Sequence, residues 1–393
     1  MLDWLIVGGG VHGSYASHRL TQPGCFERSR ARVLDPDPEP LAFWNHCAEN
    51  ASVDYLRSPG VHHLDIDPQS LYSFASSRGG QGLADWAAPY YRPGFALFQR
   101  HTRSVIERAR LRELRLVGRA QRLERRHRGW RVETERGALD ARRVLVCIGL
   151  SEQRNWPEWA RTARSGGARL DHVFELDQRP APCTSGGTLV VGSSCTAAHL
   201  VLALAREASG PVTWACGEPL RHAEYDSDPG WLGPKYLRGF GDIPSLEQRR
   251  EWIRDARKPG TIPARLLHPL QGALHRGRIQ LAVGAVKSAR ALEGGRVQVS
   301  GPEGLPDSGF DRVLLATGFE RRRPGGDWLE RTERNLELPL APCGFPQLTP
   351  TLEWGRNLLV AGELAELEVG PAARNIGGAR LVAERLVRHW RAA

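Results

Sequence analysis

Short apolar runs recur along the chain, and several of them lead directly into a glycine. Uninterrupted runs of this kind are typical of strands that are buried on both faces of a parallel sheet. Helical patterns lie between them, at residues 14–20, from Phe95 to near Arg110, up to near Arg206, and at the C-terminus. This alternation predicts an α/β protein. The apolar runs occupy residues 5–7, 31–34, 143–149, 188–191, 212–214, 312–316 and 357–361.

The first apolar run ends in a turn with the spacing G-x-G-x-x-G, formed by Gly8, Gly10 and Gly13. The second run ends on Asp35, which follows Gly13 by 22 residues. In such a motif the first glycine permits a tight turn, the second lets the backbone approach a pyrophosphate, and the third lets helix and strand pack closely. The helix N-terminus favours the phosphate charge, and the acid accepts hydrogen bonds from ribose hydroxyls. The N-terminus therefore predicts a dinucleotide site.

The apolar run at 188–191 opens a second turn of the same kind, with small residues where the backbone must come close to a ligand. No acid ends the strand that follows, at 212–214. Arg221 comes a few residues later and suits a 2′-phosphate, which favours NADPH, whereas Glu218 keeps NADH possible. This turn predicts a second dinucleotide site, made by Gly192, Ser194, Thr196 and Ala197.

Two such motifs predict two Rossmann-like dinucleotide-binding domains, the second inserted into the first. Short alternating runs at 115–117, 130–133 and 138–139 predict a small antiparallel β insertion, and further strands are expected at 279–286 and 296–300. A segment rich in proline and glycine, 179–187, predicts a linker. We therefore expect one domain from residues 1–178 with 340–393, and the other from residues 179–339.

Composition narrows the class of protein. The chain has 393 residues, 41% of them hydrophobic and 25% charged, which is typical of a globular protein with two domains. The net charge of +10 comes mainly from arginines spread over the whole chain, which argues against a nucleic-acid patch. No apolar run reaches the length of a membrane span, and the N-terminal apolar residues belong to the glycine motif rather than to a signal peptide.

Seven cysteines are present, and none forms a C-x-x-C or C-x4-C pair. This spacing argues against a zinc site and against a redox-active disulfide, and reduced cysteines predict a cytoplasmic protein. The pair His62-His63 lacks carboxylate or cysteine partners at ligand spacing. We therefore expect hydrogen-bonded histidines near a cofactor rather than a metal site.

Together these segments resemble the flavoproteins with two dinucleotide-binding domains, over nearly the whole chain. The resemblance implies that the N-terminal turn holds FAD, that the inserted turn holds NADPH, and that the strand ending at Gly318 connects the two domains. The family usually has Gly-Asp where this chain has Gly362-Glu363, in the segment that lies along the ribityl chain and flavin ring. The resemblance also implies cofactor contacts for Arg57, Ser58, Arg92, Asn375 and Ile376.

Three branches of this family compete. Disulfide reductases need a cysteine pair, which this sequence lacks. Residues 167–174 resemble the linker motif of single-component flavin monooxygenases. Residues 92–95, followed by a helix, and residues 226–231 resemble segments of the monooxygenases that N-hydroxylate amino acids and amines. The resemblance therefore favours a monooxygenase of the N-hydroxylating kind.

For such an enzyme, the resemblance implies that NADPH reduces the flavin and that the reduced flavin captures dioxygen as a C4a-hydroperoxide. One oxygen atom then passes to the nitrogen or sulfur of a small amine, amino acid or thiol. Asn375 is the candidate for a hydrogen bond at flavin N5. Residues 231–236, which include the second candidate catalytic residue Lys235, fit either a wall of the substrate pocket or a surface loop packed by its own aromatic side chains.

Two other functions fit the same motifs. One is an NADPH-dependent flavoprotein reductase that passes electrons to a protein or a quinone. The other is an FAD-binding sensor or scaffold without turnover. Neither a metal ion nor a nucleic acid is expected as a partner, and the sequence gives no signal for the oligomeric state.

Overall fold

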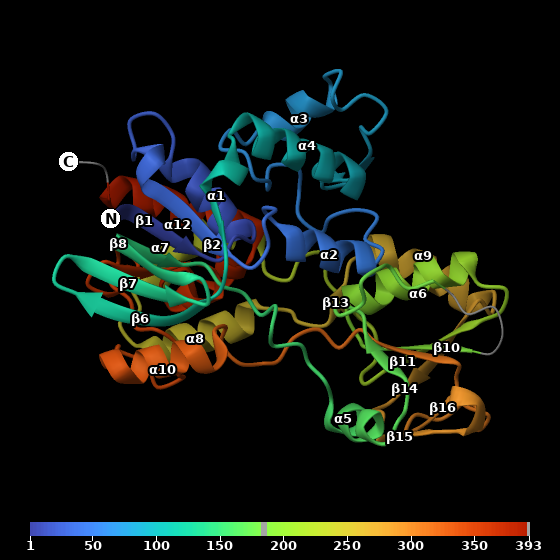
Figure 1. Ribbon diagram of the computed structural model, residues 1–393. Helices are drawn as coiled ribbons and strands as arrows, with labels where there is room; N and C mark the ends of the chain where they lie inside the picture. Colours follow the sequence, from blue (N-terminus) through green and yellow to red (C-terminus); the bar gives the residue numbers. More distant parts are fainter. Residues whose placement is uncertain (182–186, 391–393) are drawn as a thin grey trace.

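The computed structural model describes residues 1–181 and 187–390 (Figure 1). Two separate sheets, built mainly from parallel strands, lie toward opposite sides of the molecule in the view of Figure 1, and helix α2 (Ala42–Asn50) lies between them. The predicted α/β architecture with parallel sheets is thus confirmed.

The first sheet has the strand order β18-β19-β8-β1-β2-β5. Strand β1 pairs in parallel with both β8 and β2, so its apolar run is enclosed on both sides; Val7, the most exposed of residues 4–7, is only 4% exposed. Helices α1 and α12 pack against each other beside this sheet. The elements are β1 (Leu2–Val7), α1 (Val11–Leu20), β2 (Ala31–Asp35), β5 (Arg115–Val117), β8 (Gly137–Val146), β18 (Glu353–Gly355), β19 (Leu358–Val360) and α12 (Ile376–His389).

The predicted antiparallel insertion needs one correction. Residues 115–117, assigned to it from the sequence, form β5, which pairs in parallel with β2 at the edge of the first sheet. The insertion instead consists of β6 (Ala120–Arg126), β7 (Gly129–Thr134) and the first part of β8. A strand of three residues is too short to show a regular alternation of apolar and polar side chains. Its pairing therefore could not be predicted from the sequence pattern.

The second sheet has the strand order β14-β11-β10-β17-β9, and all of its pairs are parallel. Helices α6 and α9 pack against each other on its side of the molecule, and β15 with β16 forms a separate antiparallel ribbon. The elements are β9 (Leu170–His172), β10 (Thr188–Val191), α6 (Cys195–Glu207), β11 (Val212–Cys216), α9 (Ala264–His275), β14 (Ile279–Val283), β15 (Ser288–Ala291), β16 (Val297–Ser300) and β17 (Arg312–Leu315). Within the predicted linker 179–187, residues 182–186 lie outside the described residues.

The remaining elements connect and cover the two sheets. Short strands pair as β3 with β4 and as β12 with β13. They are β3 (Trp86–Ala87), β4 (Arg92–Pro93), β12 (Arg221–His222) and β13 (Thr261–Ile262). The other helices are α3 (Ser70–Ala75), α4 (Phe95–Arg108), α5 (Glu158–Ser165), α7 (Pro234–Gly241), α8 (Leu246–Ala256), α10 (Gly326–Leu336) and α11 (Glu366–Val369).

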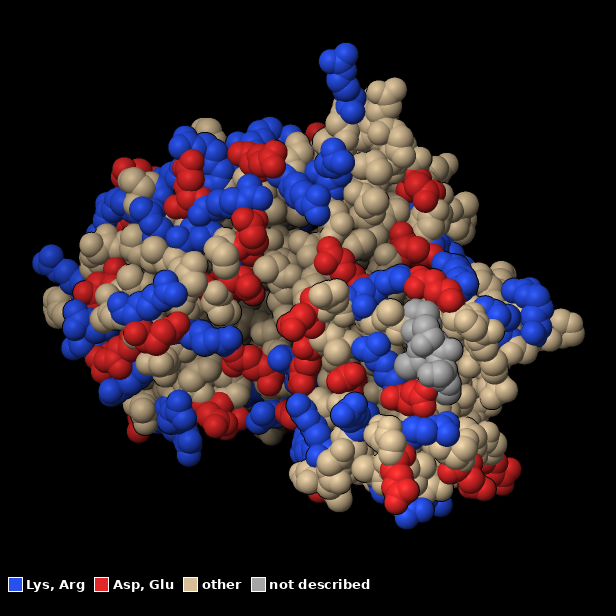
Figure 2. All heavy atoms as spheres, turned by 45° about the vertical axis from the view of Figure 1, so that its right-hand side comes forward, with Lys and Arg blue, Asp and Glu red and all other residues tan. Residues whose placement is uncertain are grey.

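Basic and acidic side chains are interspersed over the face shown in Figure 2, in line with arginines spread along the sequence. Among the described residues, no helix is long and apolar enough to cross a membrane. The six cysteines of the described segments are all free thiols, and Cys147 is buried, as expected for a core residue.

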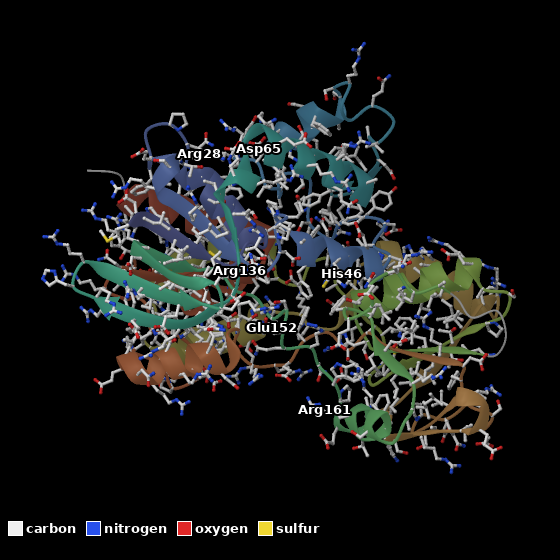
Figure 3. The ribbon with its side chains drawn as sticks, viewed as in Figure 1. Arg28, His46, Asp65, Arg136, Glu152 and Arg161 are labelled. Carbon is white, nitrogen blue, oxygen red and sulfur yellow. The ribbon has the colours of Figure 1, made fainter. Side chains whose placement is uncertain are left out.

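A buried polar cluster near α1 and α4 contains His63, His101, Ser70 and Asp65 (Figure 3 labels Asp65). Ser70 Oγ donates to Asp65 at 2.6 Å and lies 2.7 Å from His101 Nε2, and His63 Nε2 lies 3.2 Å from the carbonyl oxygen of Pro68. Hydrogen bonding, the first part of the expectation for the histidines at 62–63, is therefore confirmed for His63, whereas their position near a cofactor stays a prediction. Among the described residues, no group of three or more His, Cys, Asp or Glu side chains is arranged so that it could hold a metal ion.

Burial lowers the pKa of His63 from its ordinary 6.5 to about 4, so the folded protein holds this ring neutral at pH 7. The unfolded chain binds a proton near pH 6.5, so the stability from the neutral ring is complete above that pH and is lost as the pH falls toward 4. We expect His63 to contribute about 2 kcal/mol to the loss of unfolding free energy between pH 7.5 and pH 5. Urea unfolding of His63→Gln should show a pH dependence weaker by that amount, and an unchanged dependence would contradict this role.

Candidate functional site

The first glycine turn joins β1 to α1. Gly8 has φ +102°, and a Cβ on it would lie 2.7 Å from the carbonyl oxygen of Cys147. A Cβ on Gly13 would lie 1.8 Å from the carbonyl oxygen of Gly8, so helix and strand touch there. Gly10 differs, because no atom lies within 4 Å of the position its Cβ would take. The turn is thus closed toward the protein and open at Gly10, as an approaching pyrophosphate requires.

Asp35, the last residue of β2, faces this turn. Its Oδ2 accepts a hydrogen bond from the N–H of Gly9 at 2.5 Å, and its Oδ1 accepts one from the N–H of Asp37 at 2.9 Å. The side chain of Arg115 packs over Gly9, with Nη2 3.3 Å from Asp35 Oδ1, and donates to the carbonyl oxygens of Asp37 and Glu39. The contact of Arg115 with this turn was not predicted, because the sequence of a strand does not show against which loop a side chain packs.

His12 lies inside the same turn. Both ring nitrogens are buried, and neither makes a well-aligned hydrogen bond to the described residues, although the backbone of Arg374 and Asn375 lies close to the ring. The ring is 3.7 Å from the position of a Cβ on Gly362, so it lies between the first turn and the segment that follows β19. Burial lowers the pKa of His12 to about 4, which keeps the imidazole neutral. Buried polar groups are rarely left unpartnered, so this ring fits a site in which a polar ligand such as FAD supplies the missing partner.

Glu363 follows Gly362 and forms an ion pair with Arg374, with a distance of 2.9 Å between Glu363 Oε1 and Arg374 Nη2. Burial raises the pKa of Glu363 to about 7 despite the nearby guanidinium. Arg374 also donates to both oxygens of Glu366, which is fully buried and pairs with Arg250 as well. Glu363, which stands where the family usually has an aspartate, is thus part of a buried network of acidic residues and arginines.

Asn375 is the residue before α12, and Ile376 is the first residue of that helix. The Asn375 side chain donates to Asp226 Oδ1 at 3.4 Å, so it contacts the segment 226–231 that was singled out in the sequence. Lys235 is exposed at the start of α7, and its ammonium lies 4.6 Å from the ring centroid of Tyr236. The ammonium of Lys235 thus lies over the ring of its neighbour in α7, and its catalytic role stays a prediction.

The second glycine turn joins β10 to α6. Gly192 has φ +152°, and a Cβ on it would lie 2.4 Å from the carbonyl oxygen of Ala316, so this turn is also closed toward the protein. Helix α6 begins after Ser194, and Ala197 on its first turn is buried. Arg221 is exposed and donates to the carbonyl oxygen of Pro259 at 2.9 Å. A Cβ on Gly260 would lie 3.4 Å from Arg221 Nη2 and 4.0 Å from Ser193 O, so the guanidinium lies close to the turn.

We call the segments around the first sheet and the segments around the second sheet the two halves of the chain. A cavity of about 340 Å³ lies between these halves. Helix α2, on which Figure 3 labels His46, forms one wall, and the start of α6 forms the facing wall. Most of the lining is apolar. Three residues that were predicted to contact a cofactor, Arg57, Arg92 and Thr196, also line the cavity. The apolar lining also includes Trp44, Cys47, Ala48, Ala51, Val53, Phe174 and Phe319.

Arg57 and Arg92 connect the two halves. Arg57 donates to the carbonyl oxygens of Ala223 and Glu224, at 2.7 and 3.1 Å. Arg92 is 1% exposed and pairs with the Glu224 carboxylate at 2.9 Å, between the rings of Tyr90 and Tyr225. Ser58 is half-buried beside Arg57. Arg57 and Arg92 bind other residues of the protein in this structure, so the flavin contacts of these residues stay a prediction.

Asp54 makes a further link that the sequence did not reveal. Its Oδ2 lies 2.9 Å from Arg265 Nη2 and its Oδ1 lies 3.3 Å from His199 Nδ1, and both partners come from the other half. Gly318, with φ +72°, accepts hydrogen bonds at its carbonyl oxygen from the Asn155 N–H at 2.9 Å and from His172 at 3.1 Å. The strand that was predicted to connect the two domains is therefore followed by a hydrogen-bonded turn at Gly318. The next residue, Phe319, lines the cavity.

No protein-family model matches the sequence, and neither does any curated protein sequence. Solved structures do match. The ornithine N-hydroxylase of Kutzneria sp. 744 is 14% identical, with a TM-score of 0.74 over 99% of this chain and 98% of that one. The cadaverine monooxygenase of Erwinia amylovora is 15% identical, with a TM-score of 0.72 over 99% and 94%. The bacillithiol disulfide reductase of Staphylococcus aureus is 11% identical, with a TM-score of 0.60 over 99% and 97%.

The chain therefore shares its fold with these three proteins, and the structures of the ornithine N-hydroxylase and of the cadaverine monooxygenase contain FAD. The resemblance seen in the sequence is confirmed at the level of the fold. The TM-scores of the ornithine N-hydroxylase and the cadaverine monooxygenase are higher than that of the disulfide reductase.

Proposed function

We propose that this protein is an FAD- and NADPH-dependent monooxygenase that hydroxylates the nitrogen of a small amine or amino acid, with a thiol sulfur as the other possible target. The observation that carries the proposal is the pair of glycine turns on two parallel sheets, within a chain that matches N-hydroxylating monooxygenases over nearly its full length. The sequence has no cysteine pair at the C-x-x-C or C-x4-C spacing of a redox-active disulfide, which favours oxygenation over disulfide reduction.

The proposal includes the division into an FAD domain, residues 1–178 with 340–393, and an NADPH domain, residues 179–339. Strand pairing supports it, because β1, β2, β5 to β8, β18 and β19 share one sheet, whereas β10, β11, β14 and β17 share the other. Strand β9, at Leu170–His172, pairs with β17 of the second sheet, which favours a boundary before residue 170. The free thiols fit a cytoplasmic enzyme.

In this proposal FAD lies against Gly8, Gly10 and Gly13, with Asp35 at its ribose. His12 is positioned to hydrogen-bond the cofactor, and Gly362 with Glu363 lies beside it. When bound, the flavin accepts hydride from NADPH and activates dioxygen for transfer of one atom to the substrate. Asn375, whose amide donates to Asp226, would supply a hydrogen-bond donor to the flavin, and the apolar walls of the cavity would exclude water from the reaction.

The NADPH side of the proposal rests on Gly192, Ser194, Thr196 and Ala197, with Arg221 at the 2′-phosphate. A charge-assisted contact of an arginine with a phosphate contributes about 1.5–3 kcal/mol. We expect Arg221→Ala to raise the Michaelis constant for NADPH about ten- to a hundredfold and to leave that for NADH nearly unchanged. Steady-state kinetics with both cofactors measures this. Arg276→Ala, at another exposed arginine of the same half, is the control, and an equal loss for both cofactors would contradict the role of Arg221.

The direct test of the proposed cofactors is anaerobic titration of the purified protein with NADPH. The protein should be yellow and should lose its flavin absorbance after addition of one equivalent of NADPH. Protein that holds flavin but is not reduced would support the sensor or scaffold. Protein that is reduced but transfers its electrons only to a quinone or a carrier protein would support the reductase.

A further inference from the structure

A basic hollow of about 610 Å³ lies at the end of the first sheet, away from both glycine turns. It is formed by the turn between β6 and β7, the middle of β8, and the turn before β19. In Figure 1 the β6–β7 turn is at the left-hand edge, opposite the second sheet. Six arginines line it: Arg125, Arg126, Arg128, Arg142, Arg143 and Arg356. In the sequence these residues belong to three separate segments, and only the fold gathers them.

Acidic side chains neutralise little of this charge. Arg126 lies 2.6 Å from Glu124, but Glu124 also lies 3.3 Å from Arg122. Arg142 lies 3.7 Å from Asp3, and Asp3 already pairs with Arg30 at 3.0 Å. The other four arginines have no carboxylate within 4.0 Å among the described residues. Like charges held together repel each other, so an anion bound in the hollow would be attracted by all of them.

Arg143 provides a fixed cation at the base of the hollow. It is half-buried, and its guanidinium carbon lies 5.2 to 5.7 Å from the ring centroids of Trp4, Phe26 and Trp390. Its Nε is buried and has no hydrogen-bond partner in the described structure. A guanidinium held on aromatic rings loses little conformational freedom when it binds an anion.

The segments around the hollow are bonded to one another, so its shape does not depend on a ligand. The indole N–H of Trp130 on β7 donates to the carbonyl oxygen of Arg356 at 3.0 Å. The N–H of Val144 on β8 donates to the carbonyl oxygen of Asn357 at 3.0 Å. Gly129 has φ +136°, and a Cβ there would lie 2.2 Å from the carbonyl oxygen of Ala141, so the hairpin lies directly on β8.

We propose that this hollow is a binding site for a small polyanion that carries two or more phosphate groups. The planar guanidinium group matches the geometry of phosphate oxygens, and several arginines in one concave site favour a ligand with several such groups. The volume lies within the range of small-molecule sites. A nucleic-acid strand is less well matched, because base stacking needs exposed aromatic rings and Trp4 and Phe26 are buried beneath Arg143.

The test is isothermal titration of the full-length protein, with its flavin and with saturating NADP⁺ so that a phosphate site in the second domain is filled. Inorganic tripolyphosphate and ATP are the two probes. We expect both to bind with one site per chain and with similar affinity, and the affinity to fall as NaCl is raised from about 50 to 300 mM. Much tighter binding of ATP would identify a nucleoside polyphosphate as the ligand, and equal binding would identify the phosphate chain.

Two triple variants decide whether the hollow is the site. Arg125→Gln with Arg128→Gln and Arg356→Gln should weaken tripolyphosphate binding about tenfold or more, because each substitution removes a charge-assisted contact with a phosphate oxygen. Arg103→Gln with Arg169→Gln and Arg254→Gln removes the same charge from exposed positions elsewhere and should bind as the wild type does. Equal weakening in both triples, or no binding by the wild type at 50 mM NaCl, would overturn the proposal, as would binding of a single-stranded oligonucleotide without any response to tripolyphosphate.

Discussion

Gly10→Val should yield a folded protein without flavin. The position of a Cβ on Gly10 is free of protein atoms, and the backbone there has an ordinary φ of −67°, so a valine fits the apoprotein. The branched side chain then occupies the space through which the pyrophosphate must approach. Overpacking of a rigid contact costs about 3 kcal/mol, which corresponds to a more than hundredfold loss of FAD affinity.

The measurement is the ratio of flavin to protein absorbance after purification, followed by titration of the apoprotein with FAD. Circular dichroism should show unchanged secondary structure. Gly210→Val is the matched control, because a Cβ at Gly210 also meets no atom within 4 Å and the residue lies away from the turn. If Gly10→Val purifies folded and yellow with full occupancy, FAD is not held at this turn.

Asn375→Ala should separate flavin reduction from substrate oxidation. If the amide donates a hydrogen bond to the flavin, its removal leaves the reduction by NADPH within about twofold of the wild type but lowers the yield of hydroxylated product. A single hydrogen bond of about 1.4 kcal/mol corresponds to a tenfold lower ratio of product to NADPH consumed, with hydrogen peroxide released in its place.

A structural effect of the same substitution can be distinguished from this result. The Asn375 side chain donates to Asp226, so Asp226→Ala removes the acceptor of that contact while keeping the amide at 375. We expect the Asp226 variant to remain coupled and the Asn375 variant to be uncoupled. An Asn375→Ala enzyme that forms as much product per NADPH as the wild type would show that this amide has no part in oxygen transfer.

The fold could be predicted largely from local patterns. Buried parallel strands read as uninterrupted apolar runs, and a glycine turn between such a strand and a helix fixes the local geometry around Gly8, Gly13 and Gly192. The strand β5 was assigned wrongly because three residues carry no period, so its pairing with β2 depends on the rest of the sheet.

The side chains around the site could be predicted less well. Arg115 packs over Gly9 from a strand about a hundred residues away, and Asp54 meets His199 and Arg265 only because the two halves face each other. His12 stands within the glycine motif, but its unpartnered ring nitrogens are evident only once Gly362 is packed beside it. Such contacts between distant segments leave no periodic signal in the sequence.

The most direct test of the proposed monooxygenase is the simultaneous measurement of oxygen uptake, NADPH oxidation and N-hydroxylated product with ornithine, lysine, cadaverine and a panel of small thiols. A monooxygenase should consume oxygen and NADPH in equal amounts, and one of these substrates should stimulate both and appear as its hydroxylated or S-oxygenated product in similar yield. Oxidation of NADPH that no substrate stimulates, with hydrogen peroxide as the sole oxygen product and rapid reduction of an added quinone, would contradict it and identify a reductase.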